Sequence, residues 1–222
     1  MQTYTHAQLQ RFPWQCSHGT LRPDHLAAAY LRTLDALREL GVEGAELGEY
    51  DRAEVAALAN RADELVGTEP TEAAWHALSA TEELLGALAP VGFYFGGHAG
   101  DSSDCGFWLT EEWLDALEER GIDPDGTPAE VARLLQELDA HGIDSEDLCD
   151  AYCGTASGWS EERAGATYAE ELAEELCAID AELRWPHNCI DWAAAWHELV
   201  MGDGYALIPA ASAGEFHVIR SV

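Results

Sequence analysis

The feature that most constrains the fold is an excess of negative charge far beyond what a soluble domain needs. The 222 residues include 42 Asp and Glu against 11 Lys and Arg, a net charge of -31 at pH 7. A small domain stays soluble with a net charge of about 2 to 8. Every basic residue is Arg, so no lysines are interspersed among the carboxylates. Because ionised side chains are almost never buried without a partner, the fold must present a broadly negative surface.

The rest of the composition predicts a folded chain. Hydrophobic residues make up 47%, with 8 Trp, 7 Tyr and 5 Phe, whereas disordered acidic segments are poor in aromatic residues. The length allows one to two domains. No secretory signal and no apolar run of membrane-spanning length are apparent, so we expect a cytoplasmic protein with reduced cysteines. Adaptation to high salt stays open as another origin of the charge.

Periodicity and punctuation predict an α+β fold in which a helical N-terminal region precedes acidic helices packed on a small antiparallel hairpin. Residues 1–90 are expected to form a domain of three helices, which begin after Pro23, at Asp51 and after Pro70. A middle acidic α/β segment follows at 91–143 and a C-terminal α+β domain at 144–222. The elements expected after residue 90 are a strand at 91–95, a Gly-rich loop up to Trp108, helices at 111–120, 128–140, 146–152, 168–177 and 192–200, and paired strands at 205–208 and 216–220.

The acidic residues are arranged unfavourably for a purely structural surface. Glu170/Glu174 and Glu171/Glu175 are like-charge pairs four residues apart on one predicted helix, and each such pair destabilises an isolated helix by roughly 0.2 to 0.5 kcal/mol. A Lys or Arg at either position would stabilise it instead. From Leu84 onward, 28 acidic residues face 5 Arg, a net of -23. This arrangement indicates an acidic surface that is kept for binding.

Such a surface matches the electrostatic character of duplex DNA. DNA carries one charge per about 1.7 Å, so a charge of -31 equals that of roughly 53 Å of duplex. Rigid carboxylates can meet the same Lys and Arg groups that phosphates meet, without any bending of DNA. The sign of the charge excludes direct binding of nucleic acid or of an anionic membrane. The expected partner-binding residues are Glu161, Glu162, Glu170, Glu171, Glu174, Glu175, Asp180 and Glu182, supported by Glu111, Glu112, Asp115, Glu118, Glu119, Asp144, Glu146, Asp147 and Asp150.

The last third of the chain also carries a pattern of motifs. An acidic helix leads to Tyr152-Cys153-Gly154, and a spacer is followed by the acidic stretch at 168–175, which reads Tyr-Ala-Glu-Glu-Leu-Ala-Glu-Glu. The chain closes with Ile190-Asp191-Trp192, His197-Glu198-Leu199, Gly202-Asp203-Gly204-Tyr205 and Phe216-His217-Val218-Ile219-Arg220. In order and spacing, this region at about 144–222 resembles the ArdA family of antirestriction proteins.

The resemblance implies a non-catalytic DNA mimic without a cofactor, usually a homodimer. Such a protein binds the methyltransferase core of type I restriction-modification enzymes and protects an incoming mobile genetic element in a bacterial cell. Family members open with a strand and a small mixed domain, whereas residues 1–90 are predicted to be all-helical. The spacer at 155–166 is longer than the family pattern. An acidic adaptor, or an inhibitor of another DNA-binding protein, stays open as an alternative.

A metal-dependent enzyme is the competing hypothesis. The Gly-rich loop at 96–106 gathers His98, Asp101 and Asp104 on a backbone of the kind that often carries active sites. The sequence offers no further residues that would complete a catalytic site with these three, so a structural loop is the preferred interpretation. A zinc site would need the thiols and imidazole of Cys149, Cys153, Cys177, His187 and Cys189, but their spacing matches no closed zinc pattern.

The aromatic side chains do not indicate a nucleic-acid-binding site. Trp residues at 108, 113, 185, 192 and 196 would suit base stacking, but the charge forbids that partner. Trp192 and Trp196 lie about one helical turn apart and are predicted to be core residues.

Overall fold

The computed structural model describes residues 2–61, 69–124, 127–176 and 189–221. The chain divides into two compact units, Met1–Glu111 and Glu112–Val222. The division follows Glu111, so the middle segment expected at 91–143 is shared between the two units. Its strand belongs to the first unit and its helices to the second.

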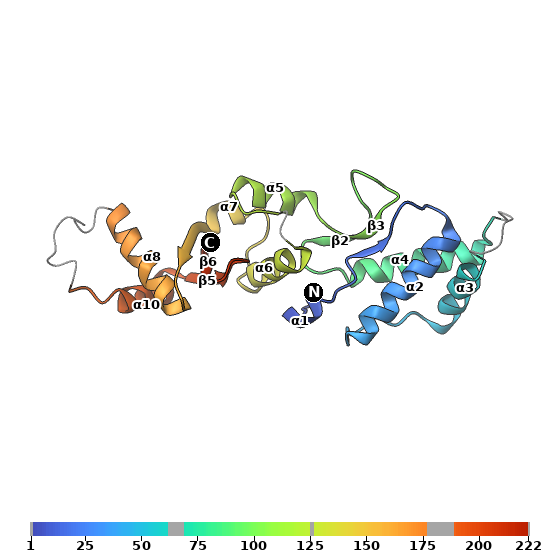
Figure 1. Cartoon of the computed structure of the whole chain (residues 1–222), viewed down its shortest axis with the longest axis horizontal. Helices are drawn as coiled ribbons and strands as arrows, with labels where there is room; N and C mark the ends of the chain where they lie inside the picture. Colours follow the sequence, from blue (N-terminus) through green and yellow to red (C-terminus); the bar gives the residue numbers. More distant parts are fainter. Residues whose placement is uncertain (1, 62–68, 125–126, 177–188, 222) are drawn as a thin grey trace. The chain divides into compact units, whose positions relative to one another are not determined.

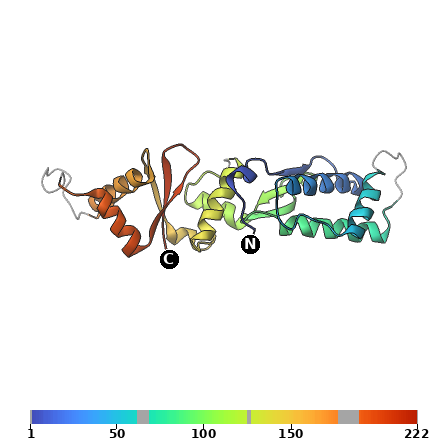
Figure 2. The same cartoon turned by 90° about the horizontal axis from the view of Figure 1, so that it is seen from below.

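The first unit combines helices with a three-stranded sheet (Figures 1 and 2). The sheet is antiparallel, with the strand order β1-β3-β2. The prediction of an all-helical region at 1–90 is therefore wrong, because the chain enters this sheet before its first long helix. In chain order the elements are α1 (His6–Leu9), β1 (Gln15–Ser17), α2 (Pro23–Glu39), α3 (Glu49–Ala59), α4 (Glu72–Ala87), β2 (Phe93–Gly97) and β3 (Cys105–Leu109).

Local sequence explains why these helices form. Pro23 occupies the first helical position of α2, and Tyr30, Leu34 and Leu37 form its buried stripe. Thr71 caps α4 by accepting a hydrogen bond from the backbone N–H of Ala74 at 3.2 Å. The predicted Gly-rich loop is wrong at its C-terminal end, since residues 105–109 form β3 in register with β2.

The second unit packs helices on another antiparallel sheet, with the strand order β4-β6-β5. The predicted pairing of the last two strands is confirmed, because Tyr205 lies opposite Arg220 and Ile208 opposite His217. In chain order the described elements are α5 (Glu111–Glu119), α6 (Pro128–Ala140), α7 (Leu148–Ala151), β4 (Tyr152–Ser157), α8 (Glu161–Glu175), α10 (Trp192–Asp203), β5 (Tyr205–Pro209) and β6 (Glu215–Arg220).

Two helix predictions in this unit need correction. The helix expected at 146–152 is the shorter α7, and Tyr152 and Cys153 belong instead to β4, which pairs with β6 through an irregular step between Tyr152 and Gly154. The helix expected to begin at Tyr168 begins at Glu161, because Ser160 caps it by accepting from the N–H of Arg163 at 3.3 Å. The predicted spacer is therefore mostly strand and helix.

One hydrophobic core of the second unit lies where α8 and α10 pack on the sheet (Figure 1). Tyr168, Trp196 and Val218 are buried there, and Trp192 packs against them, so the predicted core role of both tryptophans is confirmed. Gly165 brings the two helices together, because a Cβ on this residue would lie only 2.4 Å from the Trp196 ring. The fold class is α+β, as predicted. None of the helices in the described ranges has the length and the apolar run of a membrane span.

Candidate functional site

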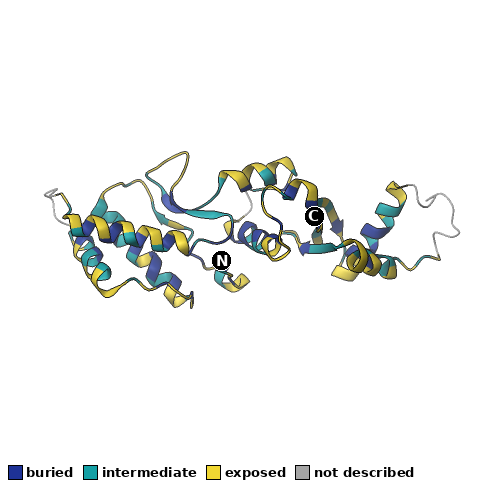
Figure 3. Cartoon of the chain, turned by 180° about the vertical axis from the view of Figure 1, so that it is seen from behind, coloured by how far each residue is buried: buried dark blue, intermediate teal, exposed yellow. Residues whose placement is uncertain are grey.

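Helix α5 presents a row of carboxylates on one face. Its acidic residues recur at intervals of three and four, which places them on the same side of a helix. Trp113 and Leu117 on the opposite side are 8% and 0% exposed and fix the helix to the unit. The buried side thus holds the acidic side toward solvent, as the colours of Figure 3 show along the helix. The exposed acids of α5 are Glu111, Glu112, Asp115, Glu118 and Glu119.

The acids before and within α7 divide into structural and solvent-facing groups. A carboxylate oxygen of Asp144 accepts hydrogen bonds from the backbone N–H groups of Glu146 and Asp147, at 2.9 and 3.0 Å. Asp144 therefore stabilises the turn that opens α7. Asp147 is partly buried, whereas Glu146 and Asp150 are exposed. Of this predicted group, Glu146 and Asp150 have the clearest access to a partner.

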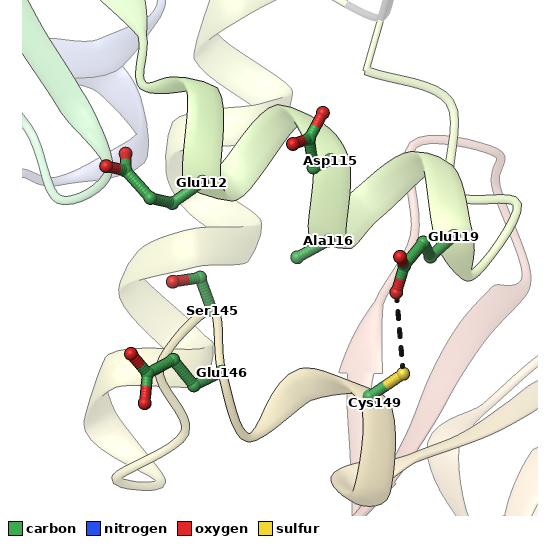
Figure 4. A pocket seen from close by; sticks show the side chains of 7 residues that line it. All are labelled: Glu112, Asp115, Ala116, Glu119, Ser145, Glu146 and Cys149. Carbon is green, nitrogen blue, oxygen red and sulfur yellow. Dashed lines mark hydrogen bonds between the residues drawn. The ribbon is translucent and has the colours of Figure 1, made fainter.

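The structure brings acids of α5 and Glu146, which precedes α7, to one hollow that sequence spacing does not reveal (Figure 4). The hollow has a volume of about 320 Å³. Cys149 is one of its lining residues, and its thiol donates to an Oε atom of Glu119 at 3.7 Å and contacts the guanidinium of Arg120. The lining residues are Glu112, Asp115, Ala116, Glu119, Ser145, Glu146 and Cys149.

Helix α8 carries the second row of predicted carboxylates. Glu161 and Glu162 lie in its first turn, where negative charge stabilises a helix N-terminus. Glu171, Glu174 and Glu175 are exposed along its last turns, and Glu170 is partly buried. The buried residues of the helix anchor it, among them Tyr168, whose ring lies edge-on to Trp196 with centroids 6.1 Å apart. Asp180 and Glu182 lie outside the described residues.

The described arginines of the second unit make contacts with groups other than carboxylates. Arg133 donates to the carbonyl oxygens of Pro209 and Ala210 at 2.8 and 3.1 Å. Arg163 lies over the ring of Trp159, and Arg220 over the ring of Tyr205, at 5.5 and 5.7 Å from the ring centroids. These three positive charges are held by carbonyls and rings, whereas Arg120 contacts the Cys149 sulfur at the hollow beside α5.

The loop between β2 and β3 uses its polar groups to hold its own shape. A carboxylate oxygen of Asp104 accepts from the N–H of Gly19 at 3.2 Å and pairs with His18. The His98 ring packs on Trp108 and accepts from the N–H of Gly100. Hydrogen bonds from Ser103 lower the pKa of Asp101, which makes it a poor general base at neutral pH. These contacts favour the structural interpretation of the loop.

The two thiols of the zinc hypothesis that are nearest in sequence lie on different elements. Cys149 belongs to α7 and Cys153 to β4. Cys177 and His187 lie outside the described residues. Within the ranges that the structure describes, no three His, Cys, Asp or Glu side chains are grouped to hold one metal ion.

Two features near the acidic helices were not predicted from the sequence. Trp159 is 86% exposed at the start of α8, beside Glu161 and Glu162. A smaller hollow of about 160 Å³ includes Arg133 and His217, and burial lowers the pKa of that histidine. The only sequence signal for Trp159 is its place between Gly158 and the capping Ser160, where a chain turns and projects side chains outward.

Comparison of the chain with protein-family models, curated proteins and solved structures gives no match. The site is therefore defined by its own geometry: two helices with buried anchoring faces and solvent-facing rows of carboxylates, and a hollow lined by acids beside α5.

Proposed function

We propose that this protein is an antirestriction DNA mimic, which occupies the DNA-binding groove of a type I restriction-modification methyltransferase with its surface carboxylates. The observation that carries the proposal is the solvent-facing acidic rows of α5 and α8, two helices whose opposite faces are buried. Because these helices are ordered before binding, their carboxylates meet a basic groove with little loss of conformational entropy.

The charge of the second unit supports this function. Residues 112–222 contain 25 acidic residues and 5 Arg, a net of -20. A groove built for DNA presents Lys and Arg at the spacing of phosphates. The negative potential of this protein would steer it toward such a positive groove. Exposed carboxylates on rigid helices reproduce that charge without providing bases, so recognition depends on charge and shape.

The ArdA resemblance supports the same function. Its two most separated motifs belong to one sheet, since Gly154 of β4 lies opposite Val218 of β6. The first unit contains a strand, β1, before its long helices, and a small antiparallel sheet beside them, and the family pattern opens with a strand and a small mixed domain. On this basis we propose that the protein is non-catalytic, acts in the cytoplasm of a bacterial cell, protects a mobile genetic element, and functions as a homodimer.

Binding to the methyltransferase core is expected to weaken steeply as salt is added. Exposed charges are screened beyond about 10 Å at 0.1 M ionic strength and beyond about 3 Å at 1 M. We expect the dissociation constant to rise at least about tenfold between 0.1 and 0.5 M NaCl, and calorimetric titration at several salt concentrations measures it. An affinity that does not change over this range would contradict charge mimicry and would favour an adaptor with an apolar interface.

A further inference from the structure

The first unit contains a pair of cysteines on adjacent strands, remote in sequence from each other. Cys16 lies in β1 and Cys105 in β3, and the two strands pair with Gln15 opposite Gly106 and Ser17 opposite Cys105. The register shifts between Gln15 and Ser17, so Cys16 is the extra residue of the irregular step. This places its backbone beside that of Cys105.

Both thiols are directed to the same helix. The hydroxyl of Thr33 donates to the sulfur of Cys16 at 3.2 Å, and the thiol of Cys105 donates to the hydroxyl oxygen of Tyr30 at 3.7 Å. Tyr30 and Thr33 lie one turn apart on α2. The two sulfurs therefore contact neighbouring residues on the same face of that helix.

The Cys16 side chain next to Cys105 lowers the pKa of Cys105 and raises that of Cys16. The hydroxyl of Tyr30 lowers the pKa of Cys105 further, while burial acts in the opposite direction. Because the thiolate is the reactive form of cysteine, the direction of these pKa shifts favours Cys105 as the nucleophile of the pair. It is only 5% exposed, so its reaction partner must be very small.

We propose that Cys16 and Cys105 form a peroxide-reactive dithiol, which closes to a reversible disulfide. In the first step, the Cys105 thiolate attacks one oxygen of hydrogen peroxide, the O–O bond breaks, and the leaving hydroxide takes up a proton to become water. The product is a sulfenic acid at Cys105. The sulfur of Cys16 then attacks Cys105 Sγ, the S–O bond breaks, and the hydroxyl leaves with the Cys16 proton as a second water. The two sulfurs lose two electrons in total, and the peroxide gains them.

The disulfide would join β1 covalently to β3 and close a loop that contains α2, α3 and α4. A cross-link of this kind restricts the unfolded chain and raises the resistance of the unit to unfolding. The cysteine pair lies in the first unit and the proposed acidic surface in the second. The inference is therefore independent of the proposed function.

The inference is tested on the full-length protein. After exposure to hydrogen peroxide, the protein is denatured, alkylated, digested and analysed by mass spectrometry. We expect a peptide pair joined through Cys16 and Cys105, which separates on addition of dithiothreitol. If both residues are alkylated as fully as in untreated protein, while exposed Cys149 or Cys153 is oxidised, the proposal is wrong.

Two variants test the order of the steps. Cys16→Ser keeps a group that can accept from Thr33 and removes the resolving sulfur, so Cys105 should remain as a sulfenic acid and be labelled by dimedone. Cys105→Ser should leave Cys16 unlabelled under the same conditions. Absence of dimedone at Cys105 in folded Cys16→Ser protein would overturn the proposed role of Cys105 as the nucleophile.

Discussion

Replacing Glu170, Glu171, Glu174 and Glu175 together by Gln is expected to weaken binding to a type I methyltransferase by about 30-fold. An exposed charge pair contributes about 0.5 kcal/mol, so the loss of four amounts to about 2 kcal/mol. Gln keeps the size of each side chain, and the change removes like-charge pairs that cost roughly 0.2 to 0.5 kcal/mol each. The variant should therefore unfold at the same temperature as the parent protein or slightly above it.

The matched control changes the same number of charges outside the proposed surface. Exposed acids of the first unit, replaced by Gln, give a variant of equal net charge; they are Glu43, Glu46, Glu72 and Glu83. This variant should bind within about threefold of the parent, because it keeps the carboxylate rows of α5 and α8. Equal weakening of both variants would mean that net charge alone matters and that α8 is not the contact face. Calorimetric titration at one fixed salt concentration compares them.

Gly165→Ala is expected to destabilise the second unit and to reduce binding with it. The added methyl group would lie 2.4 to 2.5 Å from atoms of the Trp196 ring, closer than side chains approach one another, so α8 or α10 must move. Overpacking of this kind costs about 1 to 3 kcal/mol. Since α8 carries one of the acidic rows, its displacement should also lower the affinity for the methyltransferase.

Gly86→Ala provides the comparison for this substitution. Gly86 also lies in a helix, α4, but nothing is found within 4 Å of a Cβ added there. Alanine should stabilise that helix by up to about 1 kcal/mol, because it restricts the unfolded chain. Denaturant unfolding followed by tryptophan fluorescence measures both variants. A Gly165→Ala variant as stable as Gly86→Ala would contradict the close packing of α8 on α10.

The elements that sequence reasoning found are those with strong local signals. Helix α6 begins and ends as predicted, since Thr127, Pro128 and Glu130 mark its start by side-chain identity alone. The hairpin of β5 and β6 also follows from neighbouring sequence. By contrast, β1 and β4 were not predicted because each lacks a clean alternation of apolar and polar residues and pairs with a strand far away in the chain. Strand β3 pairs with the nearby β2, but it also lacks that alternation.

In the candidate site, too, features set by local sequence could be predicted, whereas features set by contacts between distant residues could not. Helical spacing is enough to predict that the acids of α5 share one face, and burial of Trp113 and Leu117 confirms which side faces solvent. Spacing does not predict that Asp144 is used to cap a turn, because this depends on the backbone around it. Nor does it predict the hollow, since Glu146 approaches α5 only through the tertiary fold.

Competition with DNA tests the central proposal most directly. A type I methyltransferase bound to a fluorescently labelled duplex is titrated with this protein at 0.1 M salt, and release of the duplex is followed by fluorescence anisotropy. We expect complete release at near-stoichiometric protein, and release by the variant neutralised on α8 only at much higher concentration. If the duplex stays bound at a large excess of protein, even at low salt, the protein does not occupy the DNA-binding groove of that enzyme.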